Sequence, residues 1–256
     1  MIFESHAHYD DEAFDGDREE LIGKLQEQGI ACVINVTAEY SHIERSLALA
    51  EKYPFFYSSV GVHPSEVGEL NEDNFERMKS LATTKKVVAI GEIGLDYYWE
   101  KDKDKQEEQK FWFRRQLALA AEMSLPVIIH SRDAAEDTLS IMEEAAKKNI
   151  PGVIHCYSYS REIAEKYLSM GYFLGIGGVV TFQNSRKLKE TVEAAPIDRL
   201  LLETDSPYLA PEPYRGKRNS SLNLPLVIAE IARLKGITAQ EVADRTCQNA
   251  RELFHV

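Results

Sequence analysis

The segment Ile2-Phe3-Glu4-Ser5-His6-Ala7-His8-Tyr9-Asp10 opens the chain, and the rest of the sequence is organised around it. It begins with apolar residues and contains two histidines one residue apart. Residues two positions apart on a strand point to the same face, so a strand here would project both imidazoles together. Two imidazoles on one face can share a metal ion. The segment therefore predicts a first strand that ends at a metal site.

Beyond this segment, apolar strand-like runs alternate with helical patterns to the end of the chain. The later strands are predicted at 31–37, 55–62, 87–92, 126–130, 152–155, 172–180 and 200–205. The helices are predicted from 15 or 17 to 28 and at 41–52, 71–82, 106–123, 133–148, 161–170, 185–194, 224–235 and 239–254. Ser-x-x-Glu at 41–44 and Thr-x-x-Glu at 238–241 predict capping boxes at two of these helices.

This alternation predicts an α/β fold. Continuous apolar strands separated by helices are typical of a parallel sheet covered on both faces. Eight such units in 256 residues fit a (β/α)8 TIM barrel. An open doubly wound sheet is the alternative, but no Gly-x-Gly-x-x-Gly turn follows the first strand. No linker interrupts the pattern, so we expect a single domain over residues 1–256.

Composition narrows the class of protein. The formal net charge of −12 repels nucleic acid overall, so a phosphate-bearing partner would need metal ions or a local basic loop. The sequence has no leader peptide and no apolar run that would span a bilayer. Its three widely spaced cysteines argue against a disulfide framework. We expect a cytoplasmic protein that neither binds a membrane nor needs an obligate protein partner.

Histidines and carboxylates recur where the predicted strands end. Because active sites of such barrels lie at the carboxyl ends of the strands, these side chains are expected to meet at one mouth. They are His6, His8, His63, Glu92, His130, His155, Glu203 and Asp205. So many ionisable groups in one cavity are costly unless cations compensate. Nitrogen and oxygen donors of this kind suit two divalent ions, with zinc or manganese more natural than calcium.

Two of the carboxylates have specific roles in this hypothetical metal site. Glu92 can offer one oxygen to each of two ions, and Asp205 can bind a metal with one oxygen and accept a proton from water with the other. A metal lowers the pKa of its bound water from 15.7 toward about 7, and a metal pair stabilises a phosphoryl displacement. The same pair could polarise an amide or lactone carbonyl. The residues alone therefore indicate a metal-dependent hydrolase.

The motifs as a set resemble the TatD-like metal-dependent deoxyribonucleases of the amidohydrolase superfamily, and the resemblance spans the whole chain. They are Ser5-His6-Ala7-His8, Gly61-Val62-His63-Pro64, Gly91-Glu92-Ile93-Gly94-Leu95-Asp96-Tyr97, His130-Ser131-Arg132-Asp133-Ala134, Gly152-Val153-Ile154-His155-Cys156, Leu202-Glu203-Thr204-Asp205-Ser206-Pro207-Tyr208-Leu209, Arg215-Gly216-Lys217-Arg218-Asn219 and Asn249-Ala250-x-x-Leu253-Phe254. The resemblance implies a TIM barrel, two divalent ions (Zn, Mn or Mg) and 3′→5′ exonuclease activity on DNA, with single strands or 3′ ends as substrate.

The resemblance also implies roles for single residues. The family's metal ligands correspond to His6, His8, Glu92, His130, His155 and Asp205. His63 and Glu203 match positions that belong to the scissile phosphate and to the polar network of the site. We accordingly predict Asp205, Glu203 and His63 as the catalytic residues.

Two further features concern the substrate. His63, Arg215, Lys217, Arg218 and Asn219 are the predicted substrate contacts, because the basic loop follows the last strand and could hold a DNA phosphate. A solvated turn is the alternative for that loop. Residues 97–99, Tyr-Tyr-Trp, follow the fourth strand and could stack on a base or pack between helices. The sequence leaves both alternatives open.

The sequence leaves three functions open. The leading one is a deoxyribonuclease, and the second is a metal-dependent amidohydrolase or lactonase acting on a small molecule, since barrel and metals serve either chemistry. The third is a metal- or nucleotide-binding protein without turnover. A proton-accepting Asp205 beside the metal disfavours it, because binding alone needs no such group.

Overall fold

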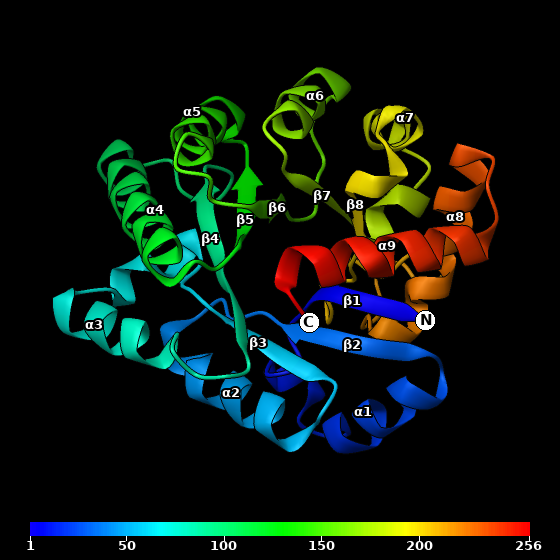
Figure 1. The fold of residues 1–256 in the computed structure, drawn as a ribbon, viewed down its shortest axis with the longest axis horizontal. Helices are drawn as coiled ribbons and strands as arrows, with labels where there is room; N and C mark the ends of the chain where they lie inside the picture. The colour runs from blue at the N-terminus through cyan, green and yellow to red at the C-terminus, as the bar shows by residue number, and fades with distance from the viewer. The chain divides into compact units, whose positions relative to one another are not determined.

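The computed structural model describes residues 1–256, and strands alternate with helices along the whole chain (Figure 1). The strands are β1 (Ile2–Ala7), β2 (Ile30–Asn35), β3 (Phe56–Val60), β4 (Val87–Asp96), β5 (Val127–Arg132), β6 (Gly152–Ile154), β7 (Phe173–Ile176) and β8 (Leu200–Leu202). The helices are α1 (Arg18–Glu27), α2 (Ile43–Lys52), α3 (Glu72–Leu81), α4 (Lys103–Met123), α5 (Ala135–Ala146), α6 (Arg161–Ser169), α7 (Arg186–Ala194), α8 (Leu224–Lys235) and α9 (Ala239–Phe254).

The topology is that of a (β/α)8 protein. The eight strands follow the sheet in chain order from β1 to β8, and helices connect them, which is the arrangement of this fold class. The predicted fold class is therefore confirmed. The chain divides into two compact units, Met1–Asn35 with Cys156–Glu252, and Val36–His155 with Leu253–Val256. This division does not test the prediction of a single domain over residues 1–256, which stays a prediction.

The first unit contains four of the strands. β1 pairs in parallel with β2, β7 pairs in parallel with β8, and a parallel bridge joins Ala7 of β1 to Ser206 just after β8. The apolar side chains of β1 and β8 other than Ile2 are buried, as expected of strands covered on both faces. α9 lies beside β1 in Figure 1, and the amide of Asn249 in α9 donates to the carbonyls of Ile197 and Leu200 at 2.8 and 2.9 Å.

The second unit is built around β4, whose ten residues are all buried. β3, β5 and β6 extend this sheet, and every pairing within the unit is parallel. Gly94 lies beside His130, and Asp96 lies beside Arg132. This register brings the ends of β4 and β5 to the same edge, so the polar residues there are neighbours.

Strand ends differ from the prediction at two places that matter for the site. β4 continues to Asp96, four residues beyond the predicted end at Glu92. β8 ends at Leu202 rather than at Asp205, and Asp205 has a left-handed backbone with φ of 57°. The strict alternation that would have placed Glu203 and Asp205 on one face therefore does not apply, because a left-handed residue breaks the period of the strand.

One of the two predicted capping boxes is present in part, through the bond that its first residue accepts. Thr238 Oγ1 accepts the backbone N–H of Glu241 at 3.1 Å at the start of α9. The box at 41–44 is wrong, because residues Tyr40–His42 form a 3-10 turn and α2 begins only at Ile43, after a cap residue that makes no side-chain hydrogen bond. Ser41 Oγ instead bonds the carboxylate of Glu39 at 3.4 Å.

No helix of the chain combines the length and apolar character needed to cross a membrane. All three cysteines are free thiols, with Cys32 and Cys247 buried and Cys156 partly exposed. This agrees with the prediction that the chain has no disulfide framework.

Gly61 and Gly91 allow the backbones after β3 and within β4 to approach closely. A Cβ on Gly61 would lie 2.6 Å from the carbonyl carbon of Gly91, and backbone atoms cannot yield as a side-chain tip can. We therefore expect Gly61→Ala to lower the free energy of unfolding by about 1–3 kcal/mol or more, as overpacking does. Gly68→Ala is the matched control, because nothing lies within 4 Å of its Cβ position. Urea unfolding of both variants measures the difference, and equal midpoints would contradict the expectation.

Candidate metal centre

The first cluster of donor atoms lies in the unit that contains β1 and β8. His6 is fully buried, and His8 is nearly so. Their Nε2 atoms are 3.1 Å apart. Asp205 Oδ1 lies 3.2 Å from His8 Nε2 and 3.7 Å from His6 Nε2. The period of β1 places both imidazoles on one face, as predicted, and the turn after β8 brings the carboxylate to them.

Main-chain hydrogen bonds hold that turn against β1. The N–H of Asp205 donates to the carbonyl of His6 at 2.9 Å, and the N–H of His8 donates to the carbonyl of Ser206 at 2.8 Å. The first bond joins two residues of the cluster, and the second joins His8 to the residue that follows Asp205. These backbone bonds therefore hold the turn that carries Asp205 against the strand that carries His6 and His8.

Glu4 is a buried carboxyl group beneath this cluster that the sequence analysis did not single out. Its Oε1 accepts the N–H groups of His6 at 3.2 Å and Thr204 at 2.9 Å, and its Oε2 accepts the hydroxyl of Thr204 at 2.7 Å. Burial raises the pKa of Glu4 to about 8. The group ties β1 to the segment after β8, and its only sequence signal was a carboxylate that directly follows the two apolar residues at the start of β1.

Glu203 is held separately from Asp205. Its Oε1 accepts the N–H of Cys156 at 2.6 Å. Its Oε2 occupies the space that a side chain at position 175 would need, since a Cβ on Gly175 would come within 2.1 Å of that oxygen. Glu203 is 1% exposed. The glycine of β7 therefore provides the room for this buried carboxylate.

The second cluster lies in the unit built around β4 and is centred on Glu92. Glu92 Oε1 is 2.9 Å from His130 Nδ1, 3.7 Å from His155 Nε2 and 3.8 Å from His63 Nε2. The glutamate is 3% exposed. The structure thus brings together all four predicted site residues of this unit, from within β4 and β5 and from the segments that follow β3 and β6.

The two ring nitrogens of His63 have different partners. Its Nδ1 accepts the backbone N–H of Ser65 at 3.1 Å. A neutral imidazole that accepts at Nδ1 carries its proton on Nε2. The Nε2–H of His63 is consequently a hydrogen-bond donor directed into the cluster, which distinguishes it from a metal ligand that needs a free lone pair.

Asp96 is a site residue that the sequence analysis quoted within a motif but gave no role. Its Oδ2 lies 3.1 Å from His130 Nε2. Burial alone would raise the pKa of Asp96, but the bond from His130 and the N–H of Trp99 outweigh it and hold the pKa below its usual value. For His130, burial would lower the pKa, and the bonds to Asp96 and Glu92 outweigh it and raise the pKa. The extended end of β4 explains the omission, because Asp96 and Glu92 share a face only if the strand continues.

The shortest donor pairs of both clusters have the separation and the chemistry of ligands to a common metal ion. Two ligands at about 2.0–2.1 Å from a common ion are about 2.9–3.4 Å apart at octahedral or tetrahedral angles. The separations of 3.1 Å for His6 and His8, 3.2 Å for His8 and Asp205 and 2.9 Å for Glu92 and His130 lie in that range. Lone pairs that face each other so closely need a proton or a cation between them. These residues can therefore hold metal ions.

Comparison with known proteins identifies the family. The family model described as TatD related DNase matches residues 3–255. The chain belongs to the TatD family. A relative from Bacillus subtilis, named Uncharacterized metal-dependent hydrolase YabD, is 42% identical over 256 residues and covers 100% of both chains. A relative from Erwinia tasmaniensis, named 3′-5′ ssDNA/RNA exonuclease TatD, is 36% identical over 249 residues and covers 95% of each chain.

The structural comparison agrees with this assignment. The crystal structure of YJJV, a TatD homologue from Escherichia coli K12, has a TM-score of 0.93 and 31% sequence identity, and the match covers 100% of this chain and 98% of that one. The resemblance to TatD enzymes predicted from the motifs is confirmed, and so is the assignment of the chain to metal-dependent hydrolases.

The loop that follows β8 carries the basic residues predicted to contact the substrate of this TatD chain. Arg218 is bound to both oxygens of Asp17 in the neighbourhood of α1. Arg215 lies over the ring of Phe182 at 4.3 Å, and Lys217 lies 5.8 Å from the ring of Tyr214. Arg215 and Lys217 therefore keep their charges available, whereas the charge of Arg218 is largely neutralised.

The same loop lines a surface hollow beside Asp205. Its walls include Tyr208, Leu209, Arg215 and Lys217. Tyr208 and Leu209 are exposed, and the Tyr208 ring is 6.4 Å from that of His8. A chain of phosphates and bases would find both cations and apolar surface there. The last predicted contact, Asn219, is buried and donates to the carbonyl of Thr204 at 2.9 Å, so its observed contact is with the segment that carries Asp205.

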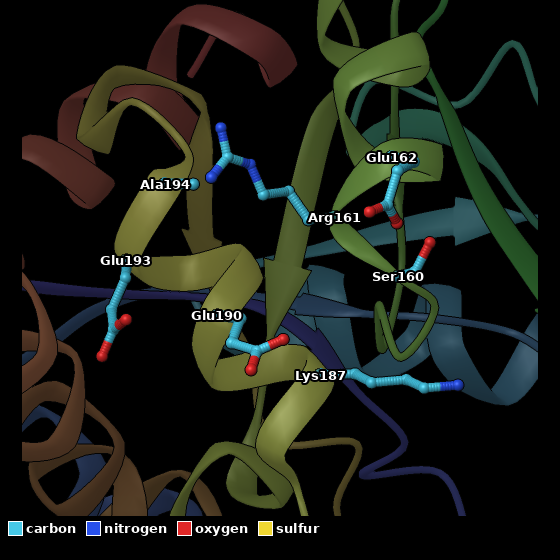
Figure 2. Close-up of a pocket in the computed structure, with 7 residues that line it drawn as sticks. All are labelled: Ser160, Arg161, Glu162, Lys187, Glu190, Glu193 and Ala194. Carbon is cyan, nitrogen blue, oxygen red and sulfur yellow. The ribbon is translucent and has the colours of Figure 1, made fainter.

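Another hollow lies on the helical surface of the same unit, between α6 and α7 (Figure 2). Its lining mixes both charges and includes Arg161, Glu162, Lys187 and Glu190. Arg161 is paired with Glu165 at 2.7 Å, one helical turn away. None of the predicted TatD site residues lines it, and exposed pairs of this kind contribute little binding energy. It is therefore not a candidate for the catalytic site.

Proposed function

We propose that the chain is a divalent-metal-dependent nuclease that removes nucleotides from the 3′ ends of single-stranded DNA. The observation that carries the proposal is the cluster of His6, His8 and Asp205, in which two imidazole nitrogens and a carboxylate oxygen lie 3.1–3.7 Å from one another. Such an arrangement is suited to a cation. A carboxylate has two oxygens, so in this proposal one binds the cation and the other accepts a proton.

The metal ligands in this proposal are those predicted from the sequence. His6, His8 and Asp205 would hold metal in one unit, and Glu92, His130 and His155 would hold metal in the other. A divalent ion, when bound, lowers the pKa of water and stabilises charge on a phosphoryl group. Two ions, and zinc, manganese or magnesium as their identity, belong to the proposal, as does a cytoplasmic location.

The chain's own residues supply the remaining steps. Asp205 accepts the proton of the attacking water on its second oxygen. His63 donates from Nε2 to an oxygen of the scissile phosphate, since its Nδ1 is occupied by the N–H of Ser65. Glu203 orders the adjacent backbone through the N–H of Cys156. Arg215 and Lys217 attract the phosphates of the strand, which offsets the net charge of −12.

Hydrolysis of an amide or a lactone is the alternative from the sequence. The same clusters would serve that chemistry, so they do not discriminate. Two relatives, those of Erwinia tasmaniensis and Pantoea vagans, are named 3′-5′ ssDNA/RNA exonuclease TatD. This supports a nucleic acid substrate, and it adds RNA to the substrates that a test should include.

One experiment separates these functions. The metal-loaded protein is incubated with 3′- and 5′-labelled single-stranded DNA, the matching duplex, the matching RNA and a panel of amides and lactones. We expect stepwise shortening of the single strand from its 3′ end. Turnover confined to the small molecules would establish the alternative. Binding of oligonucleotide without any shortening would indicate a binding protein instead.

Asp96→Asn is expected to lower the affinity for metal about 10–100-fold, because residues that orient a ligand histidine have effects of this size. The carboxylate holds His130 Nε2 at 3.1 Å and so directs Nδ1 toward Glu92. Calorimetric titration of the metal-free protein with manganese or zinc measures the change. Asp104→Asn, at an exposed position of α4, is the control. Unchanged affinity in Asp96→Asn would remove Asp96 from the metal centre.

A further inference from the structure

The turn after β4 exposes two aromatic side chains beside the second cluster. Trp99 is 70% exposed, and Tyr98 is 43% exposed. Their rings meet edge to face with centroids 4.7 Å apart, so the planes of the two rings point in different directions. Tyr97 differs from them, because its hydroxyl donates to Asp137 at 2.7 Å. Of the three aromatics in this turn, Tyr98 and Trp99 are therefore available to a ligand.

Arg132, at the end of the neighbouring strand β5, adds a positive charge to this surface. Its guanidinium lies 3.9 Å from the Tyr98 ring centre and 5.7 Å from that of Trp99. It makes no ion pair with a carboxylate, in contrast to Arg218, which is bound to Asp17. Lys101 also lies near the Tyr98 ring, at 5.8 Å. The aromatic surface is thus bordered by cations whose charge remains available.

Asp96 connects this surface to the metal ligands. Its Oδ1 accepts the N–H of Tyr98 at 2.9 Å and the N–H of Trp99 at 3.1 Å. Its Oδ2 lies 3.1 Å from His130 Nε2. One carboxylate therefore positions both the backbone of the aromatic turn and the imidazole of the cluster. A group that rests on Trp99 would be held in a defined place relative to His130.

We propose that Tyr98, Trp99 and Arg132 form a base-stacking subsite for the single strand that the nuclease shortens. The inference rests on the proposed function and names how the strand is gripped near the second cluster. Every nucleobase has a face that stacks on an aromatic ring without sequence preference. The guanidinium supplies the cation for the adjoining phosphate. An apolar protein partner would fit less well, because it would bury Arg132 without a counter-charge.

The test uses the metal-loaded protein and a single-stranded oligonucleotide with phosphorothioate linkages at its 3′ end, which slow cleavage. Binding is measured by fluorescence anisotropy of a 5′ label. We expect Trp99→Ala to weaken binding about tenfold or more, since removing one stacking aromatic typically costs about 5- to 150-fold. With a cleavable strand, the loss should fall mainly in KM. Trp99→Phe keeps an aromatic face and should recover most of the affinity.

Two controls isolate stacking from other effects. Phe111→Ala removes an aromatic that is 52% exposed on α4 and contacts Trp112 and Arg115 instead, and it should leave binding unchanged. The parent should bind an oligonucleotide with abasic residues at its 3′ end more weakly than it binds the intact strand. Trp99→Ala should bind the two strands equally, because it lacks the stacking ring. Trp99 fluorescence should be quenched by the intact strand, since the other tryptophan, Trp112, is buried.

The outcomes distinguish this inference from the proposed function. If the parent shortens DNA while Trp99→Ala binds the strand within twofold of the parent, the subsite is overturned and the nuclease stands. The same holds if the parent binds the abasic strand as tightly as it binds the intact strand. If the parent neither binds nor shortens DNA or RNA, both proposals are overturned together.

Discussion

Asp205→Asn is expected to fold, to retain some metal and to cleave DNA at least about a hundredfold more slowly than the parent. A general base typically contributes about 10²–10⁴-fold, and asparagine keeps the shape of the side chain without its proton-accepting charge. The backbone at position 205 is left-handed, with φ of 57°, a conformation that asparagine adopts readily. The bond from its N–H to the carbonyl of His6 should persist. Loss of activity would then report chemistry rather than misfolding.

The measurement is made at saturating manganese, so that a weaker affinity for metal does not resemble lost chemistry. Asp198→Asn is the matched control, because this aspartate lies just before β8 and its exposed carboxylate is 3.4 Å from Arg245. It should cleave like the parent. Cleavage by Asp205→Asn within a few-fold of the parent would show that Asp205 is not the base. Glu203 would be the next residue to test.

Glu92→Gln is expected to slow DNA cleavage at least as much as Asp205→Asn does, but through loss of bound metal rather than loss of the general base. One oxygen of Glu92 faces the nitrogens of His130, His155 and His63 at 2.9, 3.7 and 3.8 Å. Glutamine preserves the volume but removes the negative charge that would bind a cation. We expect the bound metal to decrease by about one equivalent and cleavage to fall by more than about a hundredfold, beyond the effect of residues that only orient a ligand.

Metal content after gel filtration, measured by plasma mass spectrometry, tests this directly and does not depend on activity. Glu122→Gln is the control, because that glutamate is exposed and pairs with Lys79 at 2.7 Å. It should keep the metal content of the parent. Glu92→Gln that holds as much metal as the parent, or that cleaves DNA at a comparable rate, would contradict the assignment of Glu92 as the central ligand.

The sequence by itself determined the order of the elements, the fold class and the family. Apolar runs alternating with helical periods are local properties of a chain, and they indicate which segments must be buried wherever these finally pack. The same holds for the positions of His6, His8, Glu92, His130 and Asp205 near strand ends. Their residue types and spacing in the printed chain were sufficient for the prediction of metal-dependent hydrolysis.

Only the tertiary structure decided how these residues are grouped and which atoms face one another. Asp96 joins the cluster because β4 continues to it and β5 lies beside it in register. Glu203 and Asp205 separate because the backbone turns left-handed after β8. The proton of His63 is assigned by a bond to Ser65. Register, backbone dihedrals and hydrogen-bond direction arise from pairing between distant segments, and a local pattern of residues carries no record of them.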